Sequence, residues 1–389
     1  MTPIDFNVLH RYAEKPLDDI AGFDEVYFIG DHTGTFAMRA RAIADALPNF
    51  AGMAVFSVSP EKRIRIAQQL TVRSNWRFIQ IGELIERAAT KRVLLVDFNE
   101  TLAGKNIGAK LAEQGVKVCD FIFAMHQLDL VHTYQTVKQE RDHLVANLGQ
   151  LIGLAERFDD ECSRRTLFAR LATYLTLDRR PLIEVSFPLS VFINNFSNKA
   201  GLVAGDQDIF IDAGAAHGDT ISHFYDTTGG QYRAMHAFEP DSINFRAMQG
   251  LSRHLPNVTP YFAGLGEEAG EITFYESPDC RFGSNFKGDP GARDKRTVEV
   301  LKLDDVVDEA TLLKIDVEGW EAKVLKGAAN IIAKCKPDMT VSAYHYPHDI
   351  AEILATVDAI APYKNVALRH YAPNLFDTQL VFSDRQNFR

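Results

Sequence analysis

The sequence contains little cysteine, no long apolar run and no excess of basic residues. Its four cysteines, Cys119, Cys162, Cys280 and Cys335, are too far apart among 389 residues to indicate a zinc cluster or a disulfide framework. No segment approaches the roughly 18 uninterrupted apolar residues of a membrane helix, so we expect no membrane partner. The first thirty residues are acidic and lack a basic segment before an apolar run, which indicates no signal peptide and a cytoplasmic location.

The charge balance limits the class of partner. The formal net charge is −10, and because binding to a phosphate backbone needs a basic face, we expect no nucleic-acid partner. The hydrophobic share of 46% and the charged share of 24% are ordinary for a globular protein. At roughly 100–200 residues per domain, the length indicates two or three domains. A homo-oligomer is left open.

Residues 1–131 are expected to form a small Rossmann-like α/β domain, because short apolar runs alternate with amphipathic stretches. The runs rich in Val, Ile and Phe, typical of buried parallel strands, are 25–30, 53–59, 77–82, 92–98 and 117–125. The helix-like stretches are 35–47, 60–70, 83–90 and 103–114. The turn at 30–34 could hold an anion at a helix N-terminus. It lacks the full G-x-G-x-x-G pattern, so a tight turn is the simpler interpretation.

Residues 132–204 read as a helical connector, with apolar residues at three- and four-residue spacing. A second and clearer α/β pattern fills residues 205–389. Its expected main strands are 208–214, 232–240, 258–266, 311–319 and 338–347. We also expect a pair of extra strands at 271–277 and 296–303. A closing antiparallel hairpin is expected at 365–371 and 377–383. Helices are expected from about 218, at 242–251 and at 320–332.

The stretch FIDAGAAHGDT, residues 210–220, predicts a ligand site. An apolar strand ends in Asp212, a loop with almost no side chains follows, and Asp219 and Thr220 suit the start of a helix. Ligands of open α/β sheets sit at the carboxyl ends of the strands. Gly214 and Gly218 allow a ligand to approach the backbone closely.

Two further strand ends complete an adenosine site. Glu239 and Pro240 end the next strand, and a carboxylate there can accept two hydrogen bonds from a ribose diol. The third strand ends in FAGLG, residues 262–266, where small side chains such as Ala263 and Gly264 could edge an adenine ring. These tips together would hold an adenosine with a polar tail.

The loop favours S-adenosylmethionine over a nicotinamide cofactor. The dinucleotide fingerprint needs glycine at its third position, where this chain has Ala216, and its sixth position is Asp219, an anion that would face a pyrophosphate. S-adenosylmethionine carries no phosphate, and its amino group suits Asp212 or nearby carbonyls. The expected cofactor-binding residues are Asp212, Gly214, Ala215, His217, Gly218, Asp219, Thr220, Glu239, Pro240, Ala263, Gly264, Ser284 and Asp316.

The motifs of the second half resemble those of the FkbM family of methyltransferases over about residues 205–384. The stretches that carry the resemblance, in chain order, are FIDAGAAHGDT, AFEPDSINF, AGLGEEAGEITFY, FGSN, LDDV and LLKIDVEGWEAKVLKGA. The first half looks like the Rossmann-like extension of some members. The resemblance implies a class I, seven-stranded, Rossmann-like methyltransferase fold that uses S-adenosylmethionine, and O-methylation of a sugar, a glycan or a related natural product.

Catalytic candidates follow the fourth and fifth strands. If the fourth strand persists to residue 318, Lys314, Asp316 and Glu318 point in one direction. Asp316 is then the general base or the group that orients the acceptor, Glu318 is a second candidate that could instead cap the next helix, and Lys314 could simply pair with one of them. His345 could act as base or acceptor contact, or it could be a histidine bonded within a packed loop.

Other interpretations stay open at this point. Residues 276–296, with Ser284 and Asn285, could form a lid or an ordinary hairpin loop. Asp316, Glu318 and His345 could hold a divalent cation, but no ligand spacing compels it, and we expect none. The alternatives to an O-methyltransferase are an inactive methyltransferase-like protein that binds a ligand or scaffolds an assembly, and the disfavoured nicotinamide-dependent oxidoreductase.

Overall fold

The structure is a computed structural model. It describes residues 4–30, 35–56, 76–186, 204–276 and 294–385, together with Ser59, Glu61, Ile64 and Ile66. The chain divides into two compact units. The N-terminal unit comprises Met1–Ile152 with Phe168–Ser186, and the C-terminal unit comprises Gly153–Leu167 with Phe187–Arg389. The boundaries predicted from sequence, at 131/132 and 204/205, stay predictions.

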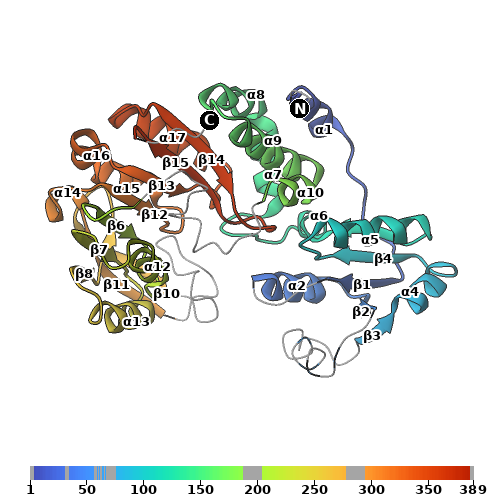
Figure 1. The fold of residues 1–389 in the computed structure, drawn as a ribbon. Coiled ribbons are helices and arrows are strands. Elements are labelled where there is room, and N and C mark those ends of the chain that lie inside the picture. Colours follow the sequence, from blue (N-terminus) through green and yellow to red (C-terminus); the bar gives the residue numbers. More distant parts are fainter. Residues whose placement is uncertain are drawn as a thin grey trace. The chain divides into compact units, whose positions relative to one another are not determined.

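The N-terminal unit is built on a five-stranded parallel sheet of strand order β3-β2-β1-β4-β5 (Figure 1). The strands are β1 (Glu25–Ile29), β2 (Phe50–Val55), β3 (Arg77–Gln80), β4 (Val93–Asp97) and β5 (Lys117–Asp120). Along the chain, these strands are preceded by α1 (Val8–Glu14) and separated by α2 (Thr35–Ala46), α4 (Ile81–Ala88) and α5 (Leu102–Glu113). The doubly wound pattern expected from the alternation of apolar runs is confirmed.

One predicted strand of this unit is half helix. The run 117–125 is strand only to Asp120, and α6 (Phe121–Gln127) follows directly. The Asp120 carboxylate accepts the N–H of Ile122 at 3.0 Å and caps the helix. The apolar residues after the cap are buried on α6, so their composition did not distinguish a buried strand from a buried helix.

The stretch after the first sheet is helical, as expected. Its helices are α7 (Val137–Ala146), α8 (Leu148–Gly153), the 3-10 turn η1 (Leu154–Arg157), α9 (Glu161–Thr176) and α10 (Arg180–Val185). The two units share α9, because its first turns belong to the C-terminal unit. There Arg369 Nη1 donates to Asp160 Oδ1 at 3.0 Å and to Ser163 Oγ at 2.7 Å. These buried bonds tie the start of α9 to strand β14 (Asn365–His370).

The C-terminal unit contains the predicted seven-stranded sheet, of strand order β14-β15-β13-β12-β6-β7-β8. The strands from β13 to β8 are parallel, and the hairpin of β14 and β15 closes the sheet in the antiparallel sense. Besides β14, the strands are β6 (Ile209–Ala213), β7 (Ala234–Phe238), β8 (Val258–Tyr261), β12 (Leu312–Ile315), β13 (Asp338–Ser342) and β15 (Thr378–Ser383).

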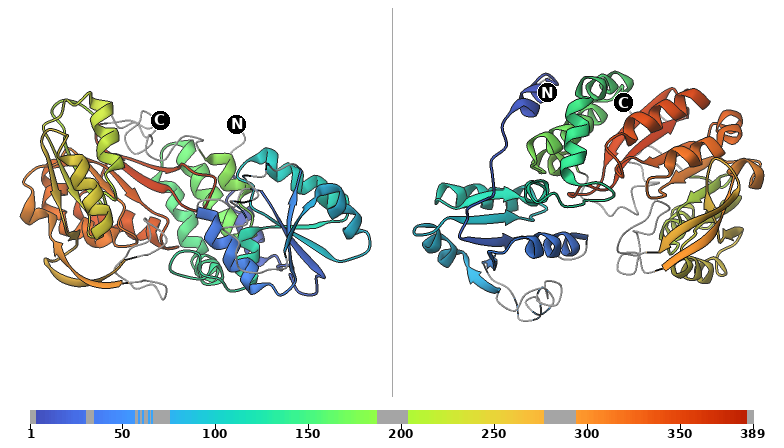
Figure 2. Two further views of the ribbon diagram at one scale, coloured as in Figure 1. Left: turned by 90° about the horizontal axis from the view of Figure 1, so that it is seen from below. Right: turned by 180° about the vertical axis from the view of Figure 1, so that it is seen from behind.

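Helices cover both faces of this sheet (Figure 2). Because parallel connections are right-handed, the helices between β6 and β8 lie on one face and those that follow β12 and β13 lie on the other. The first group is α12 (Asp219–Thr228) and α13 (Ser242–Ser252), and the second is α15 (Glu321–Gly327), α16 (Ala329–Cys335) and α17 (Asp349–Ile360). The helix predicted over 320–332 is therefore two short helices, and α17 was not predicted.

Three predicted main strands of this unit are shorter than expected, and one of them, the run 338–347, is strand only to Ser342. The run 258–266 divides into β8 and the two-residue β9 (Gly264–Leu265). β9 joins a separate small sheet with β10 (Gly270–Glu276) and β11 (Asp294–Leu301), the extra antiparallel pair that the sequence predicts. The run 311–319 is strand only to Ile315. A short helix, α14 (Leu303–Val306), precedes β12.

The cores of the two units are ordinary apolar interiors. In the C-terminal unit, Phe210 of β6 packs against Phe224 of α12 with ring centroids 4.8 Å apart.

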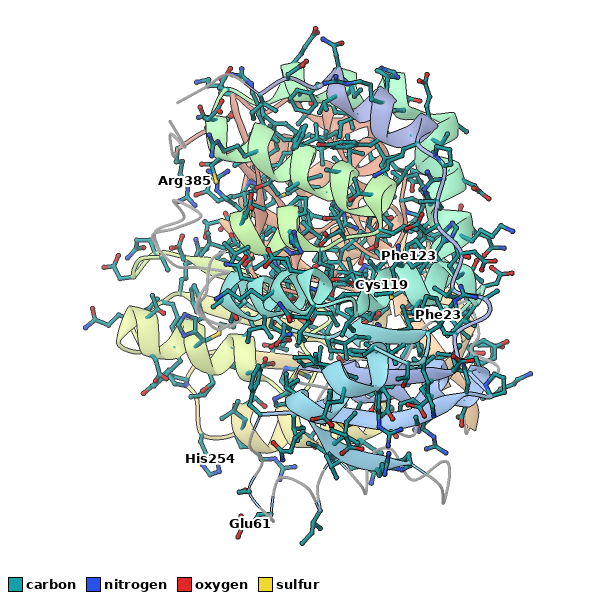
Figure 3. All side chains as sticks on the ribbon, turned by 90° about the vertical axis from the view of Figure 1, so that its right-hand side faces the viewer. Phe23, Glu61, Cys119, Phe123, His254 and Arg385 are labelled. Atoms are coloured by element: carbon teal, nitrogen blue, oxygen red, sulfur yellow. The ribbon has the colours of Figure 1, made fainter. Side chains whose placement is uncertain are left out.

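Two residues labelled in Figure 3 lie outside these apolar clusters. Arg385 follows β15, and its Nη2 lies 2.9 Å from Asp338 Oδ2 at the start of β13. In the N-terminal unit, burial raises the pKa of the Cys119 thiol in β5 (Figure 3). Across the described ranges, no helix combines the length and the apolar character needed to cross a bilayer.

Candidate active site

The loop after β6 turns sharply at the carboxyl edge of the seven-stranded sheet. The N–H groups of Gly214 and Ala215 both donate to the carbonyl of Phe238 at 3.0 Å. Gly214 has φ +80°, and a Cβ there would lie 1.9 Å from the carbonyl oxygen of Asp316, so only glycine fits. Gly218, at φ +92°, precedes the first residue of α12, Asp219. The helix therefore begins where the sequence predicts.

Glu239 connects this loop to the next strand tip. It is buried, and its Oε2 accepts the N–H of Ala216 at 2.7 Å while its Oε1 accepts the N–H of Asp241 at 2.8 Å. Burial raises the pKa of Glu239 to about 8, against the lowering effect of the two backbone N–H groups. A carboxylate has about four acceptor positions, so two bonds leave capacity for hydroxyl donors. Ala216, at φ +44°, adopts a left-handed conformation unusual for alanine.

Lys314 is a buried residue of β12 whose amine contacts the loop after β6. It faces Asp212 across the β6–β12 ladder, with Nζ 3.0 Å from Asp212 Oδ1, and it donates to the carbonyl of Gly214 at 2.6 Å. Both side chains are buried. Burial raises the pKa of Asp212 to about 6, against the charge of Lys314. Burial would lower the pKa of Lys314, but the charges of Asp212 and Asp316 raise it. Lys314 thus supports the loop through the Gly214 carbonyl, and its catalytic role stays a prediction.

The turn after β12 is held by a residue that the sequence interpretation did not select. Glu318 has φ +57° and Gly319 has φ +84°, so the strand does not persist and the predicted common direction of Lys314, Asp316 and Glu318 is wrong. The carboxylate of Glu321 accepts the N–H groups of Val317 at 3.0 Å and Gly319 at 3.2 Å. Glu321, and not Glu318, therefore closes the turn before α15.

His345 lies three residues beyond β13, and its ring contacts the carboxylates of this turn. Its ring is completely buried. Nδ1 lies 3.2 Å from Glu321 Oε1, and Nε2 lies 3.5 Å from Glu318 Oε2 and 3.7 Å from Asp316 Oδ1. The hydroxyl of Tyr344 donates to Asp316 Oδ1 at 3.3 Å. The structure therefore brings together three of the four predicted catalytic residues, Asp316, Glu318 and His345, and adds Glu321.

The electrostatics of this group favour a charged imidazole. Burial alone would lower the pKa of His345, but the charges of Glu321, Glu318 and Asp316 raise it to about 10. Burial would raise the pKa of Glu321, yet the charge and hydrogen bond of His345 lower it. A further carboxyl, Asp377 just before β15, has its pKa raised to about 7 by burial and by the charge of Asp316. Nothing in the sequence near Asp377 indicated that it would belong to this site.

The other predicted site residues lie around the loop or outside the described part. His217, Asp219 and Thr220 form the turn and first residues of α12, and Pro240 follows Glu239. Ala263 is buried and Gly264 pairs with Val300 in the small sheet. Ser284, Asn285 and residues 277–293 of the possible lid lie outside the described residues, and the ends of that segment belong to β10 and β11.

The strand order, the loop after β6 and the acidic residue at the tip of β7 define a class I methyltransferase fold. Residues 212–364 match the family described as the Methyltransferase FkbM domain, so the C-terminal unit carries an FkbM methyltransferase domain and the resemblance drawn from its motifs is confirmed. A solved structure, Methyltransferase FkbM from Methylobacillus flagellatus KT, is similar with a TM-score of 0.72 and 22% identity, over 93% of this chain and 90% of that chain. That likeness shows a shared fold.

A curated relative also matches part of this chain. Hexuronic acid methyltransferase AglP of Haloferax volcanii is 29% identical over 126 residues, which are 31% of this chain and 52% of AglP. The match therefore spans about half the length of that relative. The likeness covers only part of each chain, and what AglP acts on is a property of AglP.

Proposed function

We propose that the protein is an S-adenosylmethionine-dependent O-methyltransferase that acts on a hydroxyl of a sugar, a glycan or a related small molecule. The methyltransferase domain gives the reaction class. The name of AglP supports a carbohydrate acceptor. The observation that carries the cofactor assignment is the position of Glu239, buried at the tip of β7 and bonded to the loop after β6.

The residues at these two strand tips fit this cofactor. Glu239 keeps acceptor capacity for a ribose diol, and the positive φ angles of Gly214 and Gly218 let the loop turn sharply beside it. Asp219 is the first residue of α12, so a carboxylate stands where a dinucleotide would place its pyrophosphate. This arrangement disfavours a nicotinamide cofactor, as the sequence already indicated.

The bound cofactor supplies an electrophilic methyl group on a cationic sulfur, and the chain must orient the acceptor and remove its proton. Asp316 is partly exposed, whereas His345 and Glu321 are buried. Asp316 and Glu318 are therefore the members of the group that an acceptor hydroxyl can reach, and we assign proton removal to the Asp316 carboxylate, which would take the proton of that hydroxyl during methyl transfer. Such general bases typically contribute about 10²–10⁴-fold. His345, held by Glu321, stabilises and positions the Asp316 carboxylate.

Calorimetry of the full chain tests the cofactor assignment. We expect S-adenosylmethionine to bind, NADH not to bind, and Glu239→Gln to weaken binding of S-adenosylmethionine at least tenfold. Glu271→Gln, an exposed position on β10, is the matched control and should change nothing. Tight binding of NADH, or unchanged affinity of Glu239→Gln, would contradict the assignment.

A screen of hydroxylated acceptors, followed by mass spectrometry for one added methyl group, tests the activity. Retained cofactor binding without transfer to any carbohydrate or small-molecule acceptor would favour the alternative of an inactive, ligand-binding methyltransferase-like protein.

A further inference from the structure

The two oxygens of the Asp316 carboxylate have different surroundings. Oδ1 accepts the hydroxyl of Tyr344 at 3.3 Å and lies 3.7 Å from Nε2 of His345. In the described ranges of the chain, no hydrogen bond reaches Oδ2. A carboxylate has about four acceptor positions, so the Oδ2 side stays open to a further donor. The contacts on Oδ1 therefore decide which oxygen of Asp316 can meet an acceptor hydroxyl.

The donor on Oδ1 is a side chain that packing holds in place. Tyr344 is buried, and its ring centroid lies 4.1 Å from that of His345 and 5.8 Å from that of Phe376, which meets it edge-on. His345 is itself held, because its Nδ1 lies 3.2 Å from the buried carboxylate of Glu321. Asp316 is partly exposed, and the torsion that turns a carboxylate is broad. A fixed donor next to a carboxylate that would otherwise turn sets the orientation of that carboxylate.

The Tyr344 hydroxyl also keeps its proton. Burial, and after it the charge of Asp316, holds the pKa of Tyr344 well above its usual value, so the hydroxyl is a donor at neutral pH. A buried hydroxyl without a partner is costly, which favours the bond to Asp316. At 3.3 Å this bond is longer than the roughly 2.5–3.0 Å usual for O–H···O bonds. Catalytic hydrogen bonds are often long without substrate and tighten in the reacting complex.

We propose that Tyr344 is a positioning residue for proton removal: its hydroxyl, together with His345, holds Asp316 by Oδ1 so that Oδ2 faces the acceptor hydroxyl. This role rests on the proposed function, because it acts through the carboxylate to which proton removal is assigned. In this role the Tyr344 hydroxyl needs no contact with cofactor or acceptor. It contributes to turnover only while the carboxylate of Asp316 is present.

Tyr344→Phe tests the role, because it removes the hydroxyl and keeps the packed ring. We expect kcat to fall at least about tenfold, since orientation of a reacting group controls the rate. The KM for the acceptor and the affinity for S-adenosylmethionine should change by less than about threefold, because the hydroxyl acts on the chemical step. In the Asp316→Asn background the same substitution should lower kcat no further, because the carboxylate that it orients is absent.

The matched control is Tyr363→Phe, at the other end of the same strand. The hydroxyl of Tyr363 donates to the carbonyl of Pro337, just before β13, at 2.8 Å. This variant loses a buried tyrosine hydrogen bond away from Asp316, so it should be less stable than the wild type but keep its kcat. Wild-type kcat in Tyr344→Phe, or an equal loss with and without the Asp316 carboxylate, would overturn the positioning role.

Nuclear magnetic resonance tests the contact without an acceptor, in the full chain labelled with ¹³C at tyrosine Cζ. The Tyr344 resonance is the one missing from Tyr344→Phe. It should move in Asp316→Asn, where a neutral amide replaces the charged carboxylate, while the Tyr363 resonance stays in place. If Tyr344→Phe does not fold, the wild type and Asp316→Asn still decide, because one tyrosine resonance should move and the others should not.

The two measurements separate this role from the proposed function. A Tyr344 resonance that is unchanged in Asp316→Asn overturns the positioning role, whether or not an acceptor has been found. A resonance that moves, in a protein that methylates no acceptor of the screen, contradicts the proposed function and supports the hold of Tyr344 on Asp316.

Discussion

The amine of Lys314 lies 3.0 Å from Asp212 Oδ1, and the same amine donates to the carbonyl of Gly214 at 2.6 Å. One buried side chain of β12 therefore neutralises the last polar residue of β6 and fixes the first residue of the loop that follows it. Lys314 and Asp212 are directly paired positions of these two strands. Their ion pair therefore links neighbouring strands at the edge of the sheet where the cofactor is proposed to bind.

Replacing Lys314 by methionine should destabilise the fold strongly. Asp212 would remain buried without its counter-charge, and breaking a buried pair from one side costs about 3–5 kcal/mol. Denaturant unfolding of Lys314→Met checks the value. The double variant Asp212→Asn with Lys314→Met should recover most of the loss, because neither charge is then buried. A double variant no more stable than the single one would contradict this account. Lys326→Met, at an exposed position, should change the stability by less than about 0.5 kcal/mol.

Gly214 should not tolerate even one added methyl group. In Gly214→Ala the new Cβ would lie 1.9 Å from the Asp316 carbonyl, and the residue would keep a φ of +80°. We expect loss of cofactor binding in calorimetry and a fall in the midpoint of thermal unfolding. The comparison is Gly250→Ala within α13, where a Cβ meets nothing within 4 Å. That change should stabilise the protein by about 0.5–1 kcal/mol, because alanine is the better helix former. Equal behaviour of the two variants would show that the loop can rearrange.

The proximity of the loop after β6 to Glu239 could be predicted because parallel strands end at one edge of a sheet. Asp212 and Glu239 follow the same kind of apolar run one αβ unit apart, and the structure joins their loops through the Ala216 N–H. The end of β12 could not be predicted in the same way. A further apolar residue, Val317, follows soon after Ile315. The sequence pattern therefore predicts a longer strand, although the backbone leaves the strand at Asp316.

That misplaced strand end explains which residues were missed. With the turn placed too late, Glu318 looked like the residue that closes it, although Glu321 in the same KIDVEGWE motif holds the backbone N–H groups. The place of Asp377 near this group could not be predicted for a different reason. The charge of Asp316 acts on Asp377 only because the β14–β15 hairpin returns beside β13, which no local pattern encodes.

The stability of the cofactor-free protein should depend on pH through Glu239. Its pKa is raised by burial from 4.5 to about 8. Between these values the folded chain holds a proton that the unfolded chain has released, so the free energy of unfolding falls as pH rises, by up to about 1.4 kcal/mol per pH unit. Asp212, Asp377 and His345 also titrate abnormally. The measurement is therefore the difference between wild type and Glu239→Gln in denaturant unfolding at several pH values from 5 to 8.

The stability of the wild type relative to Glu239→Gln should decrease steadily over that range. Asp241 and Lys314 are the charged neighbours that also act on Glu239, and both remain in the variant. A difference that is independent of pH would show that Glu239 is ionised throughout, and that the buried carboxylate is stabilised by its two N–H donors alone.

Asp316→Asn should separate cofactor binding from turnover. The amide keeps the size of the side chain but cannot accept a proton, so kcat should fall by about 10²–10⁴-fold. The last residue of β6 contacts Asp316 through its backbone, since the Asp316 N–H donates to the Ala213 carbonyl at 3.0 Å, and the variant keeps that bond. The affinity for S-adenosylmethionine should then change by less than about threefold. Asp308→Asn, at an exposed position, is the matched control and should show wild-type turnover. A variant with normal turnover would remove Asp316 from proton transfer, and a variant with weak cofactor binding would place its carboxylate on the cofactor side of the site.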